Sequence, residues 1–439
     1  MTLHLNERIQ PRADTTGWRI TVLSWLVAAM PLCFAVSSRL KTLPMAVLVV
    51  IGAWLLLSRR PVRESYRLAW PVAGVCALRL LYDLANILAH RLGWGALDLP
   101  AQTLLFLAMA AAFALPLQGR AIALGFSATT ALLGIDCLIQ RYGEGIPRPY
   151  GLNGGDWASV EFAMFLLVMA LLSLLQALRG STARVDRWLH GAAVALGLYG
   201  AVLTQSRGPL LAFAPACVGL LVWHGWRIRR WRRSLALLGA IVAGMIAVTA
   251  SLHDEMVDRF ADVRTEVATY SPETTSGAIR ERLEMWRVAW QAFADHPLAG
   301  IGIDQFGPYV RAEVAAGRAA ASVAAYVHPH SEYLESMMAG GLPALLLLLL
   351  VLGVPAWYFG RRLGDPDETT ASLAMAGLLV LVMYALCALS DNVFYRAMPQ
   401  SLFLFLVLGL AVAIGRQVRL RECPLPAAEH GPNQPDRLG

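Results

Sequence analysis

Apolar segments long enough to cross a bilayer recur along most of this 439-residue chain, and they restrict its fold more than any other feature. Crossing a hydrocarbon core of roughly 30 Å takes about 20 residues of helix. Segments near that length lie at approximately 20–36, 43–58, 67–90, 100–116, 121–141, 158–178, 188–204, 209–225, 234–252, 332–359, 370–389 and 399–415. Apolar residues make up 57% of the chain and charged residues 15%, which excludes an ordinary soluble domain. The sequence predicts an all-α polytopic membrane protein with about 12 transmembrane helices.

Basic residues indicate the orientation of these helices, because short cytoplasmic loops are enriched in Lys and Arg. With the N-terminus inside, the cytoplasmic segments hold 22 arginines, against seven basic residues in the short opposite loops. Both chain ends are therefore predicted inside, and the polar interval 253–331 outside. Because the basic residues are spread over many loops, the net charge of +7 reflects topology, and we expect no nucleic-acid partner.

The segments divide the chain into four parts. Residues 1–252 hold nine predicted membrane helices, 253–331 form one long external loop, and 332–416 hold three further helices. Residues 417–439 are predicted to be a cytoplasmic tail, disordered because it is rich in Pro and polar residues. Ionisable residues concentrate in the external loop, so we expect the chemistry where that loop meets the bilayer.

A helix is predicted inside the external loop. Leu283, Trp286, Trp290 and Phe293 recur at spacings of three and four and describe one apolar face, which ends before His296-Pro297 and Gly300. Arg280 and Arg282 lie at its start. Each could be an exposed charge paired with Glu281 or Glu284, or a ligand for an anion.

Two histidines, His328 and His330, immediately precede the next membrane helix. We expect the two rings to face opposite sides, and no third ligand is apparent, so we predict no metal site. A histidine at a helix start is often structural, but neutral imidazole is also suited to accept a proton near pH 7. His330, which is nearer to Tyr333 and the helix, is the better candidate for a general base.

Three further polar turns fall on the external side. Arg207, in Gln205-Ser206-Arg207-Gly208-Pro209, could reach lipid headgroups or bind a diphosphate together with the start of the next helix. Asp391 could cap its loop, pair with Arg396, orient an imidazolium or an arginine, or contact a sugar hydroxyl. Arg148 opens a Gly-rich turn, which is either a flexible loop or a polar rim for phosphate or sugar.

The spans, in contrast, show no comparable cluster of acids. Ion-coupled transporters usually need carboxylates or broken helices near the middle of the membrane. Asp83 has Arg79 four residues earlier as a ready partner. This asymmetry favours an enzyme with an external site over a transporter.

Taken together, these motifs resemble the Wzy/WaaL O-antigen ligase and polymerase superfamily, and the long loop before the tenth helix is similar to that of the O-antigen ligase. The resemblance rests on Arg148-Pro-Tyr-Gly-Leu-Asn, Ser206-Arg207-Gly208, Arg282-Leu-Glu-Met-Trp286, His296-Pro-Leu-Ala-Gly-Ile-Gly302 with Phe306, His330-Ser-Glu-Tyr-Leu334 and Gly340-Gly341. Ser331 stands where asparagine is common in the family.

The resemblance implies a GT-C-like glycosyltransferase in the bacterial inner membrane, with its active site facing the periplasm. The implied reaction transfers polysaccharide from undecaprenyl diphosphate to lipid A-core oligosaccharide, with inversion at the anomeric carbon and without metal or cofactor. For this reaction the catalytic candidates are His330 as general base, with Arg207 and Arg280 on the diphosphate. The substrate-binding candidates are Arg282, Asp391, His328 and Arg148.

Other functions remain compatible with the same residues. An O-antigen polymerase would use the same donor and pass the glycan to another lipid-linked sugar. A further member of the group transfers glycan to protein, and no additional C-terminal domain favours it. A flippase or transporter for lipid-linked glycan would need no external base.

Overall fold

The computed structural model describes residues 17–37, 39–152, 159–229, 231–251 and 277–422. Every regular element in these ranges is a helix, which confirms the predicted all-α class. The principal helices are α1 (Gly17–Val36), α2 (Thr42–Ser58), α3 (Arg60–Leu68), α4 (Trp70–Ala89), α5 (Asp98–Met109), α6 (Gly119–Leu138), α7 (Ser159–Leu178), α8 (Arg184–Leu203), α9 (Arg207–Ile228), α10 (Trp231–Ser251), α12 (Ala278–Asp295), α13 (Phe306–Ala315), α14 (Glu332–Gly360), α15 (Glu368–Cys387) and α16 (Ala397–Glu422).

Each predicted membrane segment coincides with a helix. Among the described residues, ten helices are long and apolar enough to span a membrane, or 11 if α2 and α3, bent by 101°, form one span. Among the described helices that coincide with predicted membrane segments, the one outside this count is α8, whose first turn holds Arg184, Asp186 and Arg187. The last helix continues to Glu422, past its predicted end near 415. Residues 253–276 of the external loop and the tail beyond Glu422 lie outside the described residues.

Three helices, α7, α15 and α16, form the interior of the bundle. Their apolar stretches are 83%, 72% and 89% buried, whereas α10 lies at the edge and is 6% buried.

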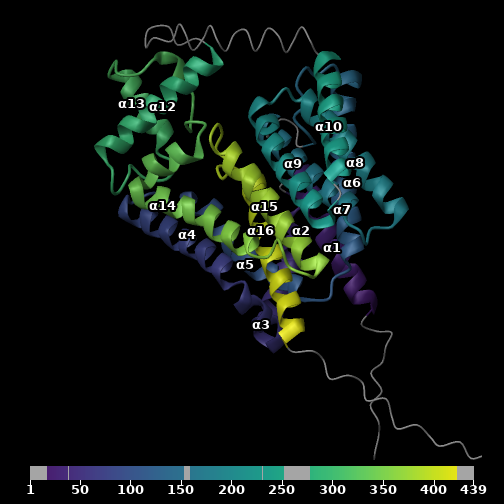
Figure 1. Cartoon of the computed structure of the whole chain (residues 1–439). Helices are drawn as coiled ribbons and strands as arrows, with labels where there is room; N and C mark the ends of the chain where they lie inside the picture. The colour runs from purple at the N-terminus through teal and green to yellow at the C-terminus, as the bar shows by residue number, and fades with distance from the viewer. Residues whose placement is uncertain (1–16, 38, 153–158, 230, 252–276, 423–439) are drawn as a thin grey trace, which may run out of the picture.

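Small residues allow close packing of helices, as membrane proteins commonly require. A Cβ at Gly52 would collide with the Ala108 backbone, and one at Gly415 with Ser65. Figure 1 shows α8, α9 and α10 grouped on one side and α12 with α13 above α14 on the other.

The helix α14 is broken at Gly340 and Gly341, which have non-helical backbone angles. The loop that follows α12 docks against this break. Leu342 N donates to Pro297 O at 2.8 Å, and Ile301 N donates to Met338 O at 2.8 Å. These bonds satisfy backbone groups that the break would leave unpaired, a necessity for irregular backbone at membrane depth.

Side chains of α4 reinforce the same junction. Tyr82 donates its hydroxyl hydrogen to Gly340 O at 2.6 Å. Asn86 donates to Ala339 O at 3.0 Å and accepts from Ile303 N at 3.0 Å. The broken helix, the loop after α12 and the end of α4 are therefore one hydrogen-bonded unit.

The predicted helix in the external loop is confirmed as α12, but its buried face differs from the apolar face seen in the sequence. Met285, Val288, Ala289 and Ala292 are buried against α13 and α14, whereas Trp290 is 55% exposed. The smaller side chains turn inward because α12 packs against two other helices at short range. The positions of the largest apolar residues in the sequence therefore did not predict which face of α12 is buried.

Replacing Gly300 by Ala should destabilise the protein more than replacing Gly317 by Ala. Both glycines have positive φ, so each substitution costs about 1 kcal/mol of backbone strain. A Cβ at Gly300 would also collide with Ala339, whereas one at Gly317 meets nothing within 4 Å. We expect a further loss of about 1–3 kcal/mol at Gly300 only, seen as a lower melting temperature in detergent. Equal losses would contradict the docking of this loop on α14.

Candidate functional site

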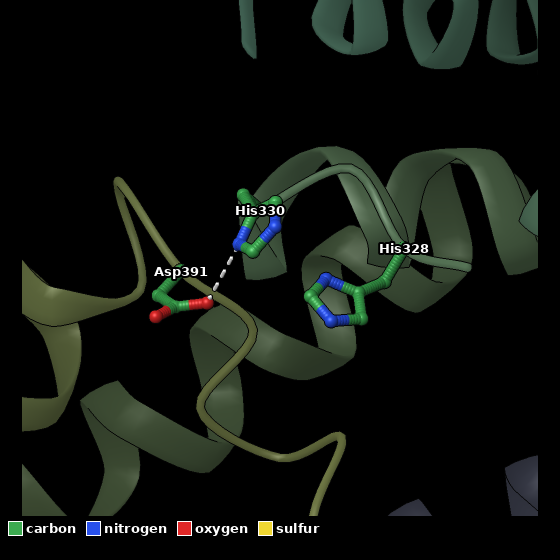
Figure 2. Close-up of side chains that lie close together, drawn as sticks. All are labelled: His328, His330 and Asp391. Atoms are coloured by element: carbon green, nitrogen blue, oxygen red, sulfur yellow. Dashed lines mark hydrogen bonds and ion pairs between the residues drawn. The ribbon is translucent and has the colours of Figure 1, made fainter. Parts of the chain in front are cut away.

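The centre of the site is a hydrogen bond between His330 and Asp391, which come from separate segments (Figure 2). His330 lies just before α14, and Asp391 lies between α15 and α16. His330 Nδ1 is 3.1 Å from Asp391 Oδ1, and the two side chains are 23% and 6% exposed. An ionised carboxylate only accepts hydrogen bonds, so the Nδ1 hydrogen points to Asp391 and Nε2 is left as the basic nitrogen.

Backbone hydrogen bonds hold these two segments together. Ser331 N donates to Asn392 Oδ1 at 3.0 Å. Glu332 N donates to Ala388 O at 3.0 Å and to Asp391 O at 3.2 Å. Asn392, which the sequence did not single out, therefore fixes the loop that carries His330.

Burial by itself would raise the pKa of Asp391. The hydrogen bond and charge of His330, with the donated hydrogen of Asn392 N at 2.9 Å, outweigh burial and hold that pKa below its usual range. Asp391 is therefore a carboxylate near pH 7, which accepts the Nδ1 hydrogen of His330.

The two histidines lie on the same side, so the prediction that they face opposite sides is wrong. Residues two apart on an extended strand share one face, so the spacing of the two histidines does not itself favour opposite sides. His330 has a left-handed backbone, with φ of 52°. The ring centroids of His328 and His330 lie 4.4 Å apart, and the Tyr395 ring lies 4.5 Å from that of His328.

As a result, His328, His330 and Asp391 form the cluster of potential metal ligands that the sequence lacked. Their ligand atoms all lie within 4.8 Å of one another. Two imidazoles and a carboxylate also form a known catalytic zinc set, and His328 Nδ1 is buried without a hydrogen-bond partner. The Asp391 oxygen that faces His330 already accepts the Nδ1 hydrogen of that ring. The arrangement thus fits either a metal or a paired general base.

Burial, together with the nearby His330, lowers the pKa of His328 to about 4. His328 is consequently neutral near pH 7. It can donate or accept a hydrogen bond to substrate but carries no charge there.

Two arginines converge on the turn between α8 and α9. Arg207 is the first residue of α9, and a Cβ built at Gly208 would lie 2.7 Å from Ser390 Oγ. The start of α9 therefore lies against the loop that carries Asp391. Arg148 Nε donates to Thr204 O at 3.1 Å in the same turn. Part of the Gly-rich turn, 153–156, lies outside the described residues.

The other two arginines, Arg280 and Arg282, lie in the first turn of α12. Glu281, between them, accepts a hydrogen bond from the Tyr326 hydroxyl at 2.5 Å. The Tyr326 ring lies 5.8 Å from the His330 ring. Tyr326 thus connects the start of α12 with the base candidate. Glu284, proposed from the sequence as a partner of these arginines, forms an ion pair with Arg287 at 2.8 Å.

One ion pair of this region escaped the sequence analysis. Arg396, offered there as a partner of Asp391, pairs with Glu161 of α7 at 3.1 Å. Glu161 is 5% exposed, so the pair ties α7 to the loop before α16 in a buried position. The two residues are far apart in sequence, and no motif marks them.

The expectation that acids do not cluster in the helices is wrong. The ion pair of Arg79 with Asp83 is confirmed, at 2.8 Å. Beside it, Glu332, Glu335 and Asp304 line the same cavity, about 120 Å³ in volume, between α4, α14 and α16. Long-range packing at the break of α14 creates this cluster, and no local pattern reveals it.

The fold and the site define a polytopic membrane protein with a His–Asp pair and arginine-bearing turns at one end of the helix bundle. Residues 192–349 match the family model for O-antigen ligase, which supports membership of the Wzy/WaaL O-antigen ligase superfamily. The chain is also similar to an uncharacterized protein of Haemophilus influenzae, 22% identical over 327 residues that make up 71% of this chain and 80% of that protein. The family supports a function of the O-antigen ligase or polymerase type, with lipid-linked polysaccharide as substrate.

Acidification should destabilise the wild type more than a His328→Gln variant. Because the pKa of His328 is about 4 in the fold, and about 6.5 when exposed, the unfolded state binds more protons between these values. Stability is therefore lost as pH falls through that window, by up to about 2 kcal/mol at pH 5. Melting temperatures at pH 7.5 and pH 5 measure it. An identical pH response in both proteins would show that His328 is not buried as a neutral ring.

Proposed function

We propose that this protein is an O-antigen ligase of the bacterial inner membrane, with its active site facing the periplasm. It transfers polysaccharide from undecaprenyl diphosphate to lipid A-core oligosaccharide. The observation that carries the proposal is the hydrogen bond of His330 with buried Asp391, beside the start of α9 that bears Arg207. A base next to fixed cations is what an attack on a sugar diphosphate requires.

In this reaction His330 Nε2 takes the proton of an acceptor hydroxyl as its oxygen attacks the anomeric carbon. The bond from that carbon to the diphosphate oxygen breaks on the opposite face, so the configuration inverts and the diphosphate leaves with the electron pair. Asp391 keeps the ring in the tautomer that has a free Nε2 and stabilises the imidazolium that forms. Asp391 is a positioning residue here.

The leaving diphosphate needs positive charge that is already in place. Arg207 and Arg280 are proposed to bind it, with Arg282 and Arg148 in support, because guanidinium groups make bidentate bonds to phosphate oxygens. These bonds strengthen as negative charge develops on the leaving group. His328, neutral and beside His330, is proposed to contact the sugar.

The scheme uses no metal ion, because the arginines supply the charge. A divalent ion held by His328, His330 and Asp391 would occupy the groups that otherwise move the proton. Activity measured with a metal chelator therefore distinguishes proton transfer by these residues from metal binding by them.

A His330→Ala variant should lose transfer by a factor of about 10²–10⁴, the usual contribution of a general base. The assay uses purified protein in detergent with lipid-linked O-antigen, lipid A-core and EDTA, and it follows the capped lipopolysaccharide. His296→Ala is the matched control, because His296 is an exposed histidine at the end of α12. Loss of wild-type activity in EDTA, restored by a divalent ion, would refute the metal-free scheme.

The same assay tests the polymerase alternative. A polymerase would lengthen the lipid-linked glycan and leave lipid A-core unchanged, and it could use the same His330 and arginines. That outcome would agree with the proposed catalytic residues and contradict the proposal that lipid A-core is the acceptor.

A transporter of lipid-linked glycan is the second candidate function, and two observations favour it. The helix α14 is broken near its outer end, and a cavity lined by four carboxylates adjoins the break. Both features occur at the binding sites of transporters. In sealed vesicles, movement of the donor across the bilayer that persists in His330→Ala, without any capped product, would favour transport.

A further inference from the structure

A long groove runs between α8 and α10. Figure 1 shows these two helices on the side of the bundle away from the label of α14. Its volume is about 1000 Å³, and helices α7 and α9 form its floor. It follows α8 from Arg187 to Val202, a length of about 22 Å at 1.5 Å per residue. The residues that line its length are mostly apolar: Val194, Ala195, Leu198, Val202, Leu237, Ala240, Ile241, Met245 and Val248.

The charged residues of the groove gather at one end. Arg187 of α8 and Arg233 of α10 are both exposed there, with His224 of α9 beside them. None of the described residues that line the groove is acidic. The nearby Asp186 is already paired with Arg120 at 2.7 Å. The end of the groove therefore offers positive charge without a protein partner of opposite sign in its lining.

This cationic end lies opposite the His330–Asp391 site. Along α9, Arg207 begins at the site, and His224 lies about 25 Å further on. A lipid whose charged group sits at Arg187 and Arg233 therefore belongs to the other leaflet. The glycan donor, which places its diphosphate beside His330, would have its charged group at the end of the bundle opposite Arg187 and Arg233.

We propose that this groove binds an anionic phospholipid of the leaflet opposite the His330–Asp391 site. Its phosphate headgroup pairs with Arg187 and Arg233, and an acyl chain lies along the apolar groove between α8 and α10. One leaflet of hydrocarbon is about 15 Å deep, so the groove is long enough for the chain. Basic pockets between helices are typical binding sites for anionic headgroups.

The lipid would supply packing that the protein lacks at this place. α10 is only 6% buried along its span, and much of its contact with α8 is replaced by the groove. A bound chain fills that space and so adds to the stability of the arrangement by mass action.

Native mass spectrometry of the purified protein tests the proposal, with a supplied equimolar mixture of phosphatidylglycerol and phosphatidylethanolamine. The wild type should retain phosphatidylglycerol preferentially. The double variant Arg187→Gln/Arg233→Gln should lose that preference by about 30-fold, since each arginine near an anionic headgroup contributes about fivefold. The control is Arg59→Gln/Arg60→Gln, which removes the same charge at the same end of the bundle but outside the groove.

A second variant tests the apolar part without touching the charges. Gly191 and Gly244 line the groove, and a Cβ at either position meets nothing within 4 Å. Gly191→Phe with Gly244→Phe should fill the groove and displace both lipids while the helices remain intact.

Three results would overturn the proposal. They are unchanged phosphatidylglycerol retention in Arg187→Gln/Arg233→Gln, equal loss in the Arg59/Arg60 control, and retention of added undecaprenyl phosphate in place of phospholipid. The last result would assign the groove to an isoprenoid chain. The measurement needs no glycan donor or acceptor, so it is independent of the proposed transfer reaction.

Discussion

The site depends on the hydrogen bonds between the segment before α14 and the loop between α15 and α16. Ser331 and Glu332 donate their backbone hydrogens to Asn392, Ala388 and Asp391. A non-glycine residue at positive φ is strained, so without these bonds the backbone of His330 would also adopt other conformations. The bonds hold this conformation in place and keep the His330 ring beside Asp391.

The same arrangement explains which parts of the molecule could be predicted. The helices follow from apolar length alone, because a helix satisfies nearly all of its backbone hydrogen bonds within one segment, as lipid requires. His330 and Asp391 could be named as candidates because each adjoins a predicted helix on one side of the membrane. An imidazolium was one of several partners that the sequence allowed for Asp391, but the choice among them could not be made, because His330 and Asp391 lie 61 residues apart. The approach of His328 to both residues was not predicted.

The acidic cavity and the pair of Glu161 with Arg396 escaped prediction for a related reason. Glu332 and Glu335 of α14 come close to Asp83 of α4 only in the folded bundle, and Glu161 of α7 pairs with Arg396 of the loop before α16. Reading each span alone therefore found only Asp83, with Arg79 of the same helix as its partner. Likewise, α12 buries Met285 and Ala289 and leaves Trp290 at the surface, because the shape of α13 and α14 decides which face fits.

The break in α14 divides one helix between two surroundings. Residues 342–360 cover about 28 Å, which is close to a full hydrocarbon core. The first turns, 332–339, are therefore released from contact with lipid, and this is why carboxylates such as Glu332 and Glu335 can occupy a helix that is otherwise almost wholly apolar. The part of α14 after the break thus spans the membrane, and the part before it carries ionisable side chains, with Gly340 and Gly341 at the boundary between the two.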